Sequence, residues 1–349
     1  MSAAIDIRAV EELTIRFYTW PEGFIGEVQR KSQSNPPIDE QTKIPLMDLE
    51  NYCCGAHGLS LLLTTRIGEE KHTVLFDAGP ESKSIDRNVK SFDSDLSGVE
   101  RIVLSHWHAD HSGGILTALG LIQEHREKNA VTHNMPATVV DLHPDRPAAR
   151  GIWPPMSPEK PMIQLPADPT FTEIEAARGA VDLHAEPHAV ANGTMYISGT
   201  IQRQTEHESG LFGACQYVNG VWQKGPKNPG WLIMDERYLA IDVKGKGLVV
   251  FSSCSHAGIV NVCMSALAAF QNSKPLYAVV GGFHLGGMGM EERIPATVKY
   301  FSEELAIKAK YLVPMHCTGF NAKVALRNAL GDAVVPAGAG CRMIFKAEE

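Results

Sequence analysis

The chain has 349 residues and a mass of 38.0 kDa, so one large domain or two smaller ones are expected. Hydrophobic residues make up 44% and charged residues 21%, which excludes a disordered or fibrous chain. The 40 acidic residues outnumber the 32 basic ones, and this net charge of -8 argues against nucleic acid as a partner.

The composition and the first residues also indicate where in the cell the protein is expected. No apolar run is long enough to span a bilayer, and the first residues lack the apolar core of a secretory signal. Seven cysteines, an odd number without a C-x-x-C pair, argue against a disulfide framework. We therefore expect a cytoplasmic protein that does not enter the membrane.

Strands and helices alternate along most of the chain. In chain order we expect strands at 13–18, 59–63, 73–76 and 102–104, a helix at 115–128, strands at 195–199 and 248–251, a helix at 259–270, a strand at 277–280, a helix at 294–305, a strand at 311–313 and a helix at 321–330. The last helix is expected to end at Gly331. This alternation is typical of an α/β protein.

A proline-rich segment interrupts the pattern. Residues 136–169 hold nine of the 21 prolines, and regular structure cannot run far through such a stretch. We interpret residues 129–190 as an insertion in a single domain spanning 1–349, packed over the active-site face of the core.

One segment concentrates side chains that bind metals. His106, His108, Asp110 and His111 occupy four of six consecutive positions directly after the strand expected at 102–104. Alternate residues leaving a strand point the same way, so His106 and His108 can hold one ion, and the other two can face a second. These donors suit Zn, Fe or Mn in a site that keeps an open position. The alternative is a polar loop with incidental histidines.

Further chemically active side chains follow three of the later strands. Cys254 with His256, then His284, then His316 each come just after an expected buried strand, beside Gly or other small residues. Active-site groups gather at strand ends in α/β folds. A single histidine there is usually a core or capping residue, but three in succession predict a shared site.

These motifs resemble those of a known family. Residues 105–114 resemble the signature of the metallo-β-lactamase superfamily, and residues 76–79 are similar to its Asp motif. The resemblance implies a four-layer αββα sandwich with a mono- or dinuclear metal site at one edge, and it implies that Asp77 orients a ligand loop. The chain resembles one branch in particular, the dihydropterin ribofuranosyl-aminobenzene phosphate synthase-like proteins. The segments that carry this resemblance are residues 56–60, 253–261, 281–285 and 314–319.

The resemblance also implies the ligand set, with one departure. His316 matches the last ligand of the superfamily, but no histidine follows the strand at 195–199 where one is usual, and the usual bridging Asp is replaced by Cys254-Ser255-His256. We assign His256 as the remaining ligand, with Cys254 as the alternative. His284 is assigned to catalysis or substrate binding, with ligation as the alternative.

Weaker candidates remain for ligation and substrate contacts. His188 and His207 are the nearest other imidazoles, and we expect them at the surface. His57, Arg203 and Trp153 are candidates for substrate binding. Their alternatives are a turn histidine, an ordinary salt bridge and packing. The sequence leaves open whether one ion or two bind.

The resulting prediction is a metal-dependent hydrolase. A metal-bound hydroxide, oriented by Asp110, would attack an electrophilic centre while His284 donates a proton to the departing atom. We expect a small cyclic amide or ester (lactam or lactone), because Arg203 and Lys323 are the only cations near the motifs to clamp a phosphate. The alternatives are phosphoester or pterin-phosphate chemistry, as in the branch, and a non-enzymatic metal-binding protein. A small molecule is the expected partner, and a homo-oligomer is left open.

Overall fold

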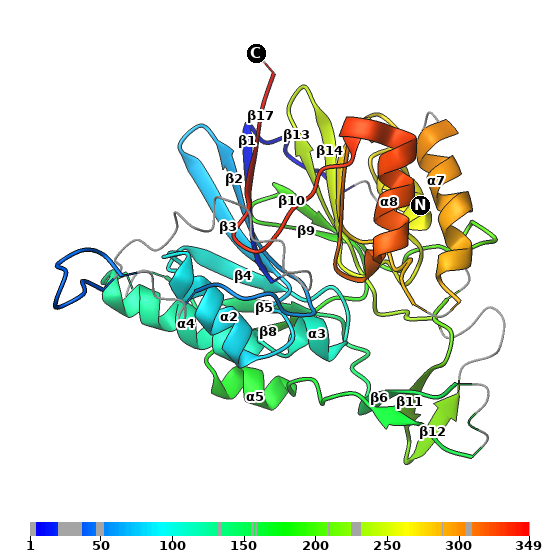
Figure 1. The fold of residues 1–349 in the computed structure, drawn as a ribbon, viewed down its shortest axis with the longest axis horizontal. Helices are drawn as coiled ribbons and strands as arrows, with labels where there is room; N and C mark the ends of the chain where they lie inside the picture. Colours follow the sequence, from blue (N-terminus) through cyan, green and yellow to red (C-terminus); the bar gives the residue numbers. More distant parts are fainter. Residues whose placement is uncertain are drawn as a thin grey trace.

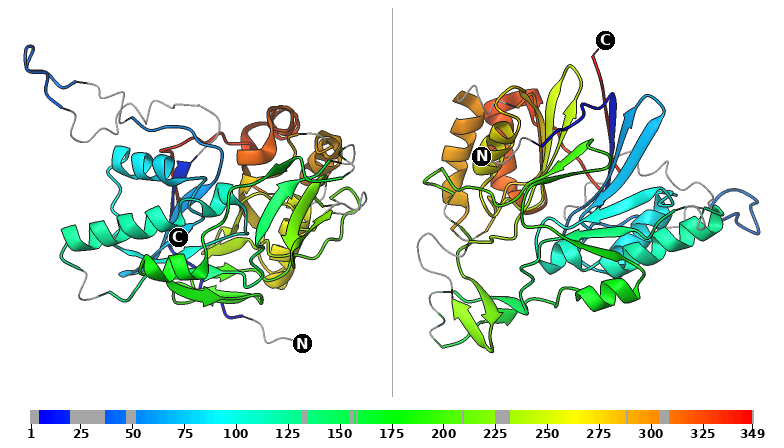
Figure 2. Two further views of the ribbon diagram at one scale, coloured as in Figure 1. Left: turned by 90° about the horizontal axis from the view of Figure 1, so that it is seen from below. Right: turned by 180° about the vertical axis from the view of Figure 1, so that it is seen from behind.

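Two large β-sheets pack face to face, with helices on both outer faces (Figure 1, Figure 2). The structure is a computed structural model that describes residues 5–19, 37–46, 52–131, 135–154, 157, 159–208, 210–224, 232–287, 289–303 and 309–348. None of the helices within these ranges is long and apolar enough to cross a membrane.

The first sheet has seven strands, with helices covering its outer face. Its spatial order is β17 (Arg342–Lys346), β1 (Glu12–Thr19), β2 (Ser60–Ile67), β3 (Glu70–Phe76), β4 (Val99–Val103), β5 (Val139–Leu142) and β8 (Ala180–Leu183). The helices that cover it are α2 (Ser82–Ser91), α4 (Ile115–Lys128) and α5 (Phe171–Ala176) (Figure 1). The short α3 (Ala109–Ser112) follows β4.

The second sheet has six strands. Its spatial order is β16 (Tyr311–Met315), β15 (Leu276–Gly282), β14 (Gly247–Ser252), β13 (Leu239–Val243), β10 (Met195–Ile197) and β9 (His188–Val190). Its outer face is covered by α6 (Ile259–Ala269), α7 (Ile294–Glu303) and α8 (Phe320–Leu330) (Figure 1).

Strand β14 shows why the molecule has four layers. Its residues are all buried, and successive side chains of a strand point to opposite faces. Val249 and Phe251 belong to the core between the two sheets, whereas Leu248 and Val250 belong to a second core beneath the helices. This is the αββα sandwich that the resemblance implies.

Most predicted elements are present. The helix at 115–128 coincides with α4, and α8 ends at Gly331, whose φ of 56° only glycine adopts without strain. The helix expected at 294–305 is described to Glu303, and Leu305 lies outside the described residues.

The expected insertion at 129–190 is too broad. Strands β5 and β8 and helix α5, all within that range, belong to the first sheet and its covering layer. A separate small sheet has the order β12 (Val221–Lys224), β11 (Ala214–Val218), β6 (Ala149–Ile152) and β7 (Ile163–Gln164), and it lies away from the main layers (Figure 1). Strands β5 and β8 are only four residues long, so their pattern is too short to be recognised in the sequence.

A buried carboxylate connects the two sheets at one edge. Asp141 of β5 accepts hydrogen bonds from Arg237 Nη1 (2.7 Å), Arg101 Nη1 (2.7 Å) and His188 Nε2 (2.8 Å). His188 is therefore half-buried in an ion network, rather than at the surface as expected. Burial alone would raise the pKa of Asp141, but its partners, His188 and Arg237 above all, hold this pKa well below its usual value.

We expect Asp141→Asn to lower the free energy of unfolding at pH 7 by about 3–5 kcal/mol, because the variant leaves the buried charge of Arg237 uncompensated. A carboxyl whose pKa is depressed by folding stabilises the fold above the pKa of the unfolded chain, about 3.9, and loses this effect as pH falls further. The difference between variant and wild type, measured by urea unfolding, should therefore narrow as pH falls below about 4.

Asp182→Asn is the matched control. Asp182 pairs with the same Arg101 Nη1, at 2.8 Å, but its side chain is 36% exposed, so a loss of at most about 1 kcal/mol is expected. If the loss of unfolding free energy caused by Asp141→Asn does not change with pH, folding does not depress the pKa of Asp141.

Candidate metal centre

The candidate ligands lie on loops at one end of the two sheets. His106, His108, Asp110 and His111 follow β4, with the last two in α3. The remaining candidates follow the parallel strands β14, β15 and β16, whose carboxyl ends meet at the same edge. Residues far apart in the sequence are thereby brought into one group.

Three imidazoles form the first cluster. His106 Nε2 lies 2.9 Å from His108 Nδ1 and 3.1 Å from His256 Nε2, and the latter two atoms are 3.1 Å apart. Three ring nitrogens that converge in this way cannot all satisfy one another by hydrogen bonds, because a neutral imidazole has only one N–H. They can instead present lone pairs to a common cation.

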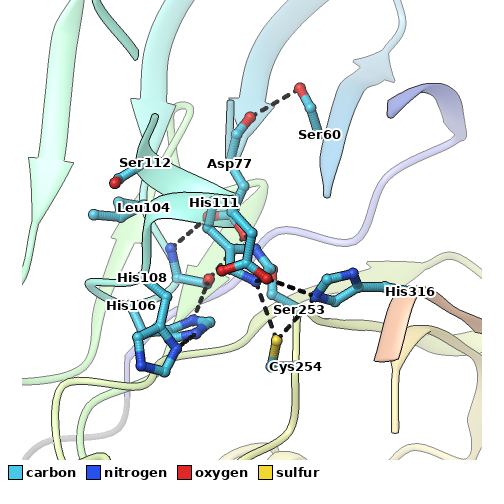
Figure 3. Close-up of polar contacts among 12 residues, drawn as sticks. Ser60, Asp77, Leu104, His106, His108, His111, Ser112, Ser253, Cys254 and His316 are labelled. Atoms are coloured by element: carbon cyan, nitrogen blue, oxygen red, sulfur yellow. Dashed lines mark hydrogen bonds and ion pairs between the residues drawn. The ribbon is translucent and has the colours of Figure 1, made fainter. Parts of the chain in front are cut away.

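The second cluster contains Asp110, His111, Cys254 and His316. Cys254 Sγ lies 3.1 Å from both His111 Nε2 and His316 Nε2 (Figure 3). Asp110 Oδ2 is 3.3 Å from His316 Nε2 and 3.5 Å from His111 Nε2. Two imidazoles, a carboxylate and a thiol thus point at one position.

Cys254 belongs to both clusters. Its sulfur also lies within 4.8 Å of the ligand atoms of His106 and His256. Cys254 and His256 are therefore not alternatives for one position, as the sequence suggested: His256 completes the first cluster, and Cys254 lies between the two. The sequence could not separate them because both residues follow β14 on one short loop.

Asp77 holds the two ligand loops together. Its carboxylate accepts hydrogen bonds from the backbone N–H and the hydroxyl of Ser105, at 2.7 and 2.8 Å, from the Ser253 hydroxyl, and from His111 Nδ1 at 2.8 Å (Figure 3). With Nδ1 donating to Asp77, His111 presents the lone pair of Nε2 to the second cluster. Asp77 thus has the position that the resemblance implies.

The loops are held in an uncommon backbone conformation. Asp77, Ser255, His284 and His316 have φ values of 57°, 60°, 46° and 48°, in the left-handed region that non-glycine residues rarely adopt. Such strain persists only where surrounding contacts determine it, and it concentrates at functional sites.

The electrostatics of the first cluster keep its rings neutral. Burial lowers the pKa values of His106, His108 and His256 well below their usual value, and neighbouring positive groups add to the effect. Burial also lowers the pKa values of His284 and His316 to about 4. Neutral imidazoles are the form that binds metals.

The second cluster has a field that favours positive charge. Burial alone would raise the pKa of Asp110, but His111 and His316 hold it well below its usual value. Burial alone would lower the pKa of His111, but Asp110 and Asp77 raise it well above 6.5. A cation is therefore stabilised at this position.

The clusters form the floor of a pocket of about 450 Å³. His57, Asp110 and His284 line it, and the His57 side chain is 66% exposed, 3.7 Å from Asp110. The His284 ring lies 4.5 Å from the ring of His256. Apolar side chains also line the pocket and form an apolar wall, namely Ile152, Leu165, Pro166, Leu211 and Phe212.

Two predicted substrate contacts do not line this pocket. The Arg203 guanidinium donates to the carbonyls of Ile201 and Ile233, so it braces its own loop. The Trp153 indole N–H donates to the Ser157 carbonyl, and its ring faces Lys224. The sequence does not reveal local contacts of this kind.

His207 does not line the pocket either; its ring stacks on Tyr300 and is half-buried, rather than at the surface as expected. Sequence reasoning missed Arg150 of β6, which lines the pocket, and its partner Asp235. It also missed the buried Glu236, which accepts from the backbone N–H groups of His256 and Ala257 at 2.7 and 2.6 Å. None of these lies in a recognisable motif.

The donor set fits the binding of metal. Nitrogens bound to one tetrahedral Zn at about 2.0–2.1 Å lie roughly 3.3 Å apart, close to the separations in the first cluster. His, Asp and a thiolate are the donors that zinc and similar ions bind, and Asp77 supplies the hydrogen bond that orients one of them. The two clusters therefore support a metal cofactor.

Known proteins are similar to this chain in sequence and in fold. Residues 58–203 match the model of the metallo-beta-lactamase superfamily. The chain is 29% identical over 273 residues to the 7,8-dihydropterin-6-methyl-4-(beta-D-ribofuranosyl)-aminobenzene-5'-phosphate synthase of Methanocaldococcus jannaschii, covering 76% of this chain and 82% of that protein. It is 26% identical over 270 residues to the uncharacterised protein MJ0448 of the same organism, covering 77% and 87%.

Among solved structures, the fold is similar to that of Tm1679, a metal-dependent hydrolase of the beta-lactamase superfamily. The TM-score is 0.66 at 20% identity, over 96% of this chain and 99% of that one. Sequence match, αββα fold and clustered donors agree with the resemblance that the motifs carry. The chain is therefore similar to the metallo-β-lactamase superfamily, in sequence over residues 58–203 and in fold over most of its length.

Proposed function

We propose that the protein is a metal-dependent hydrolase that opens small esters, lactones or lactams. The observation that carries this proposal is the pair of donor clusters, joined at Cys254, on the floor of a pocket of about 450 Å³. A pocket of this size fits a small molecule.

The chain's own residues supply binding and orientation. His106, His108 and His256 would hold one Zn ion, and Asp110, His111 and His316 a second, while Cys254 lies within reach of both clusters. Bound Zn would supply Lewis acidity and lower the pKa of water.

Asp110 and His284 complete the chemistry on the pocket side. The Asp110 side chain is 28% exposed, so its carboxylate is accessible from the pocket and can orient a water molecule. His284 lines the pocket beside His256, where its ring N–H can donate to the departing atom.

The pocket lining favours a carbonyl substrate over a phosphate. Arg150 is the only lysine or arginine among the described lining residues, and Asp235 offsets its charge at 2.5 Å. Phosphoryl transfer usually needs several cations around the non-bridging oxygens. The apolar wall suits a flat, mostly uncharged substrate.

A second candidate function is chemistry on a phosphate-bearing aromatic substrate. The relative from Methanocaldococcus jannaschii favours it, because that protein is named as the synthase of a pterin-linked aminobenzene phosphate. For this chain, such a substrate would place its phosphate against Arg150.

Matched panels test the two candidates. Zn-reconstituted protein should hydrolyse small lactones or lactams but not phosphomonoesters or phosphodiesters. Turnover confined to the phosphorus compounds would favour the second candidate. A protein that retains its metal yet turns over none of the panel would contradict both.

A further inference from the structure

Arg150 is a buried cation in the pocket whose hydrogen-bond donors are mostly unused. It belongs to β6 of the small sheet, is 6% exposed and lines the pocket. Nη2 donates to Asp235 Oδ1 at 2.5 Å, whereas Nε is buried without a partner among the described residues. The other oxygen of Asp235, Oδ2, accepts from the Trp107 backbone N–H at 2.7 Å.

The remaining nitrogen faces a group that cannot accept its hydrogen. Arg150 Nη1 lies 3.5 Å from His108 Nε2. The other nitrogen of this ring, Nδ1, points at His106 and His256 and must carry the lone pair if the first cluster holds a metal. In a neutral imidazole the hydrogen is then on Nε2, so two donors face one another across 3.5 Å.

We propose that Arg150 Nη1 and His108 Nε2–H together bind one anionic oxygen of the substrate, a carboxylate or phosphate oxygen. An oxygen at about 2.8–2.9 Å from both donors fits between atoms 3.5 Å apart. Buried unpaired donors are costly, so such an oxygen is strongly favoured. The inference rests on the proposed function, since it requires that His108 hold a metal through Nδ1.

The surroundings favour a single negative charge over a double one. Asp235 already offsets one positive charge, and Asp110 adds a further negative charge to the pocket lining. A carboxylate therefore matches the pocket better than a phosphate dianion. The substrate inferred is a small ester or lactone that carries one carboxylate beside its apolar part.

Binding of three probes to the Zn-loaded protein tests this, by calorimetry: benzoate, benzamide of the same shape, and phenyl phosphate. Benzoate should bind about 10- to 100-fold more tightly than benzamide, as expected for charge-assisted hydrogen bonds. In the double variant Arg150→Gln/Asp235→Asn, which removes both charges of the pair, this preference should disappear while zinc content and Tm are kept.

Arg203→Gln is the matched control, because Arg203 is also largely buried but does not line the pocket. It should keep the preference for benzoate. Equal affinity of the wild type for benzoate and benzamide, or no measurable binding of benzoate, overturns the proposal. So does a preference that survives in the double variant, since the metal ions alone would then hold the anion.

The phosphate probe identifies the source of the oxygen. If phenyl phosphate binds more tightly than benzoate, with the same dependence on Arg150, the two donors still bind an anionic oxygen, but the oxygen belongs to a phosphate ester. Binding is measured without turnover, so the two proposals can fail separately. If the protein does not hydrolyse lactones but still prefers benzoate over benzamide through Arg150, this inference holds and the hydrolase proposal fails.

Discussion

Zn-reconstituted Cys254→Ala is expected to hold metal at least about tenfold more weakly than the wild type. The reason is the position of the sulfur, 3.1 Å from His111 Nε2 and His316 Nε2 and within reach of the first cluster. Without it, the second cluster keeps two imidazoles and one carboxylate and loses its soft anionic donor. Competition with a chelator and elemental analysis measure the loss.

Substitution of zinc by Co²⁺ gives a second readout. A thiolate bound to Co²⁺ produces a charge-transfer absorption band, which should be present in the wild type and absent from Cys254→Ala. Cys317→Ala is the matched control, because Cys317 also lines the pocket and donates to the Cys254 carbonyl at 3.4 Å, yet belongs to neither cluster. Unchanged chelator competition in Cys254→Ala would show that its sulfur is not a ligand.

Asp110→Asn is expected to lower kcat on a lactone substrate by about 10²- to 10⁴-fold. The amide keeps the size of the side chain but loses the charge that faces His111 and His316 and the acceptor that orients water. Circular dichroism and Tm should show an intact fold, and metal analysis separates loss of catalysis from loss of the ion.

Asp332→Asn controls for the loss of one carboxylate, because Asp332 is 98% exposed and lies just after α8. It should retain the wild-type kcat. An Asp110→Asn enzyme that holds its metal and keeps the wild-type kcat would exclude Asp110 from the reaction.

The sequence predicts the local part of the site well. His106, His108, Asp110 and His111 are close in the chain, so strand alternation and one helical turn suffice to place them in two groups. The alternation of strands and helices predicts the α/β class, and the four-layer arrangement is what the resemblance to the metallo-β-lactamase superfamily implies.

The sequence does not predict the positions of side chains that depend on tertiary contacts. The positions of Cys254 and His256 depend on how the loop after β14 meets the other sheet, which spacing does not encode. Arg150 lies in a proline-rich segment without a motif, and it reaches the pocket only because β6 pairs with β11. Short strands between prolines, such as β5, give a pattern too brief to distinguish from a loop.

The division of the ligands between the two sheets couples the site to the core. Four donors follow strand β4 of the first sheet, and Cys254, His256 and His316 follow strands of the second. Metal-binding geometry must be kept to within roughly 0.5 Å. The geometry of the centre therefore depends on how the two sheets are aligned, so a change in packing at Phe251, between the sheets, is expected to alter the spacing of the donors.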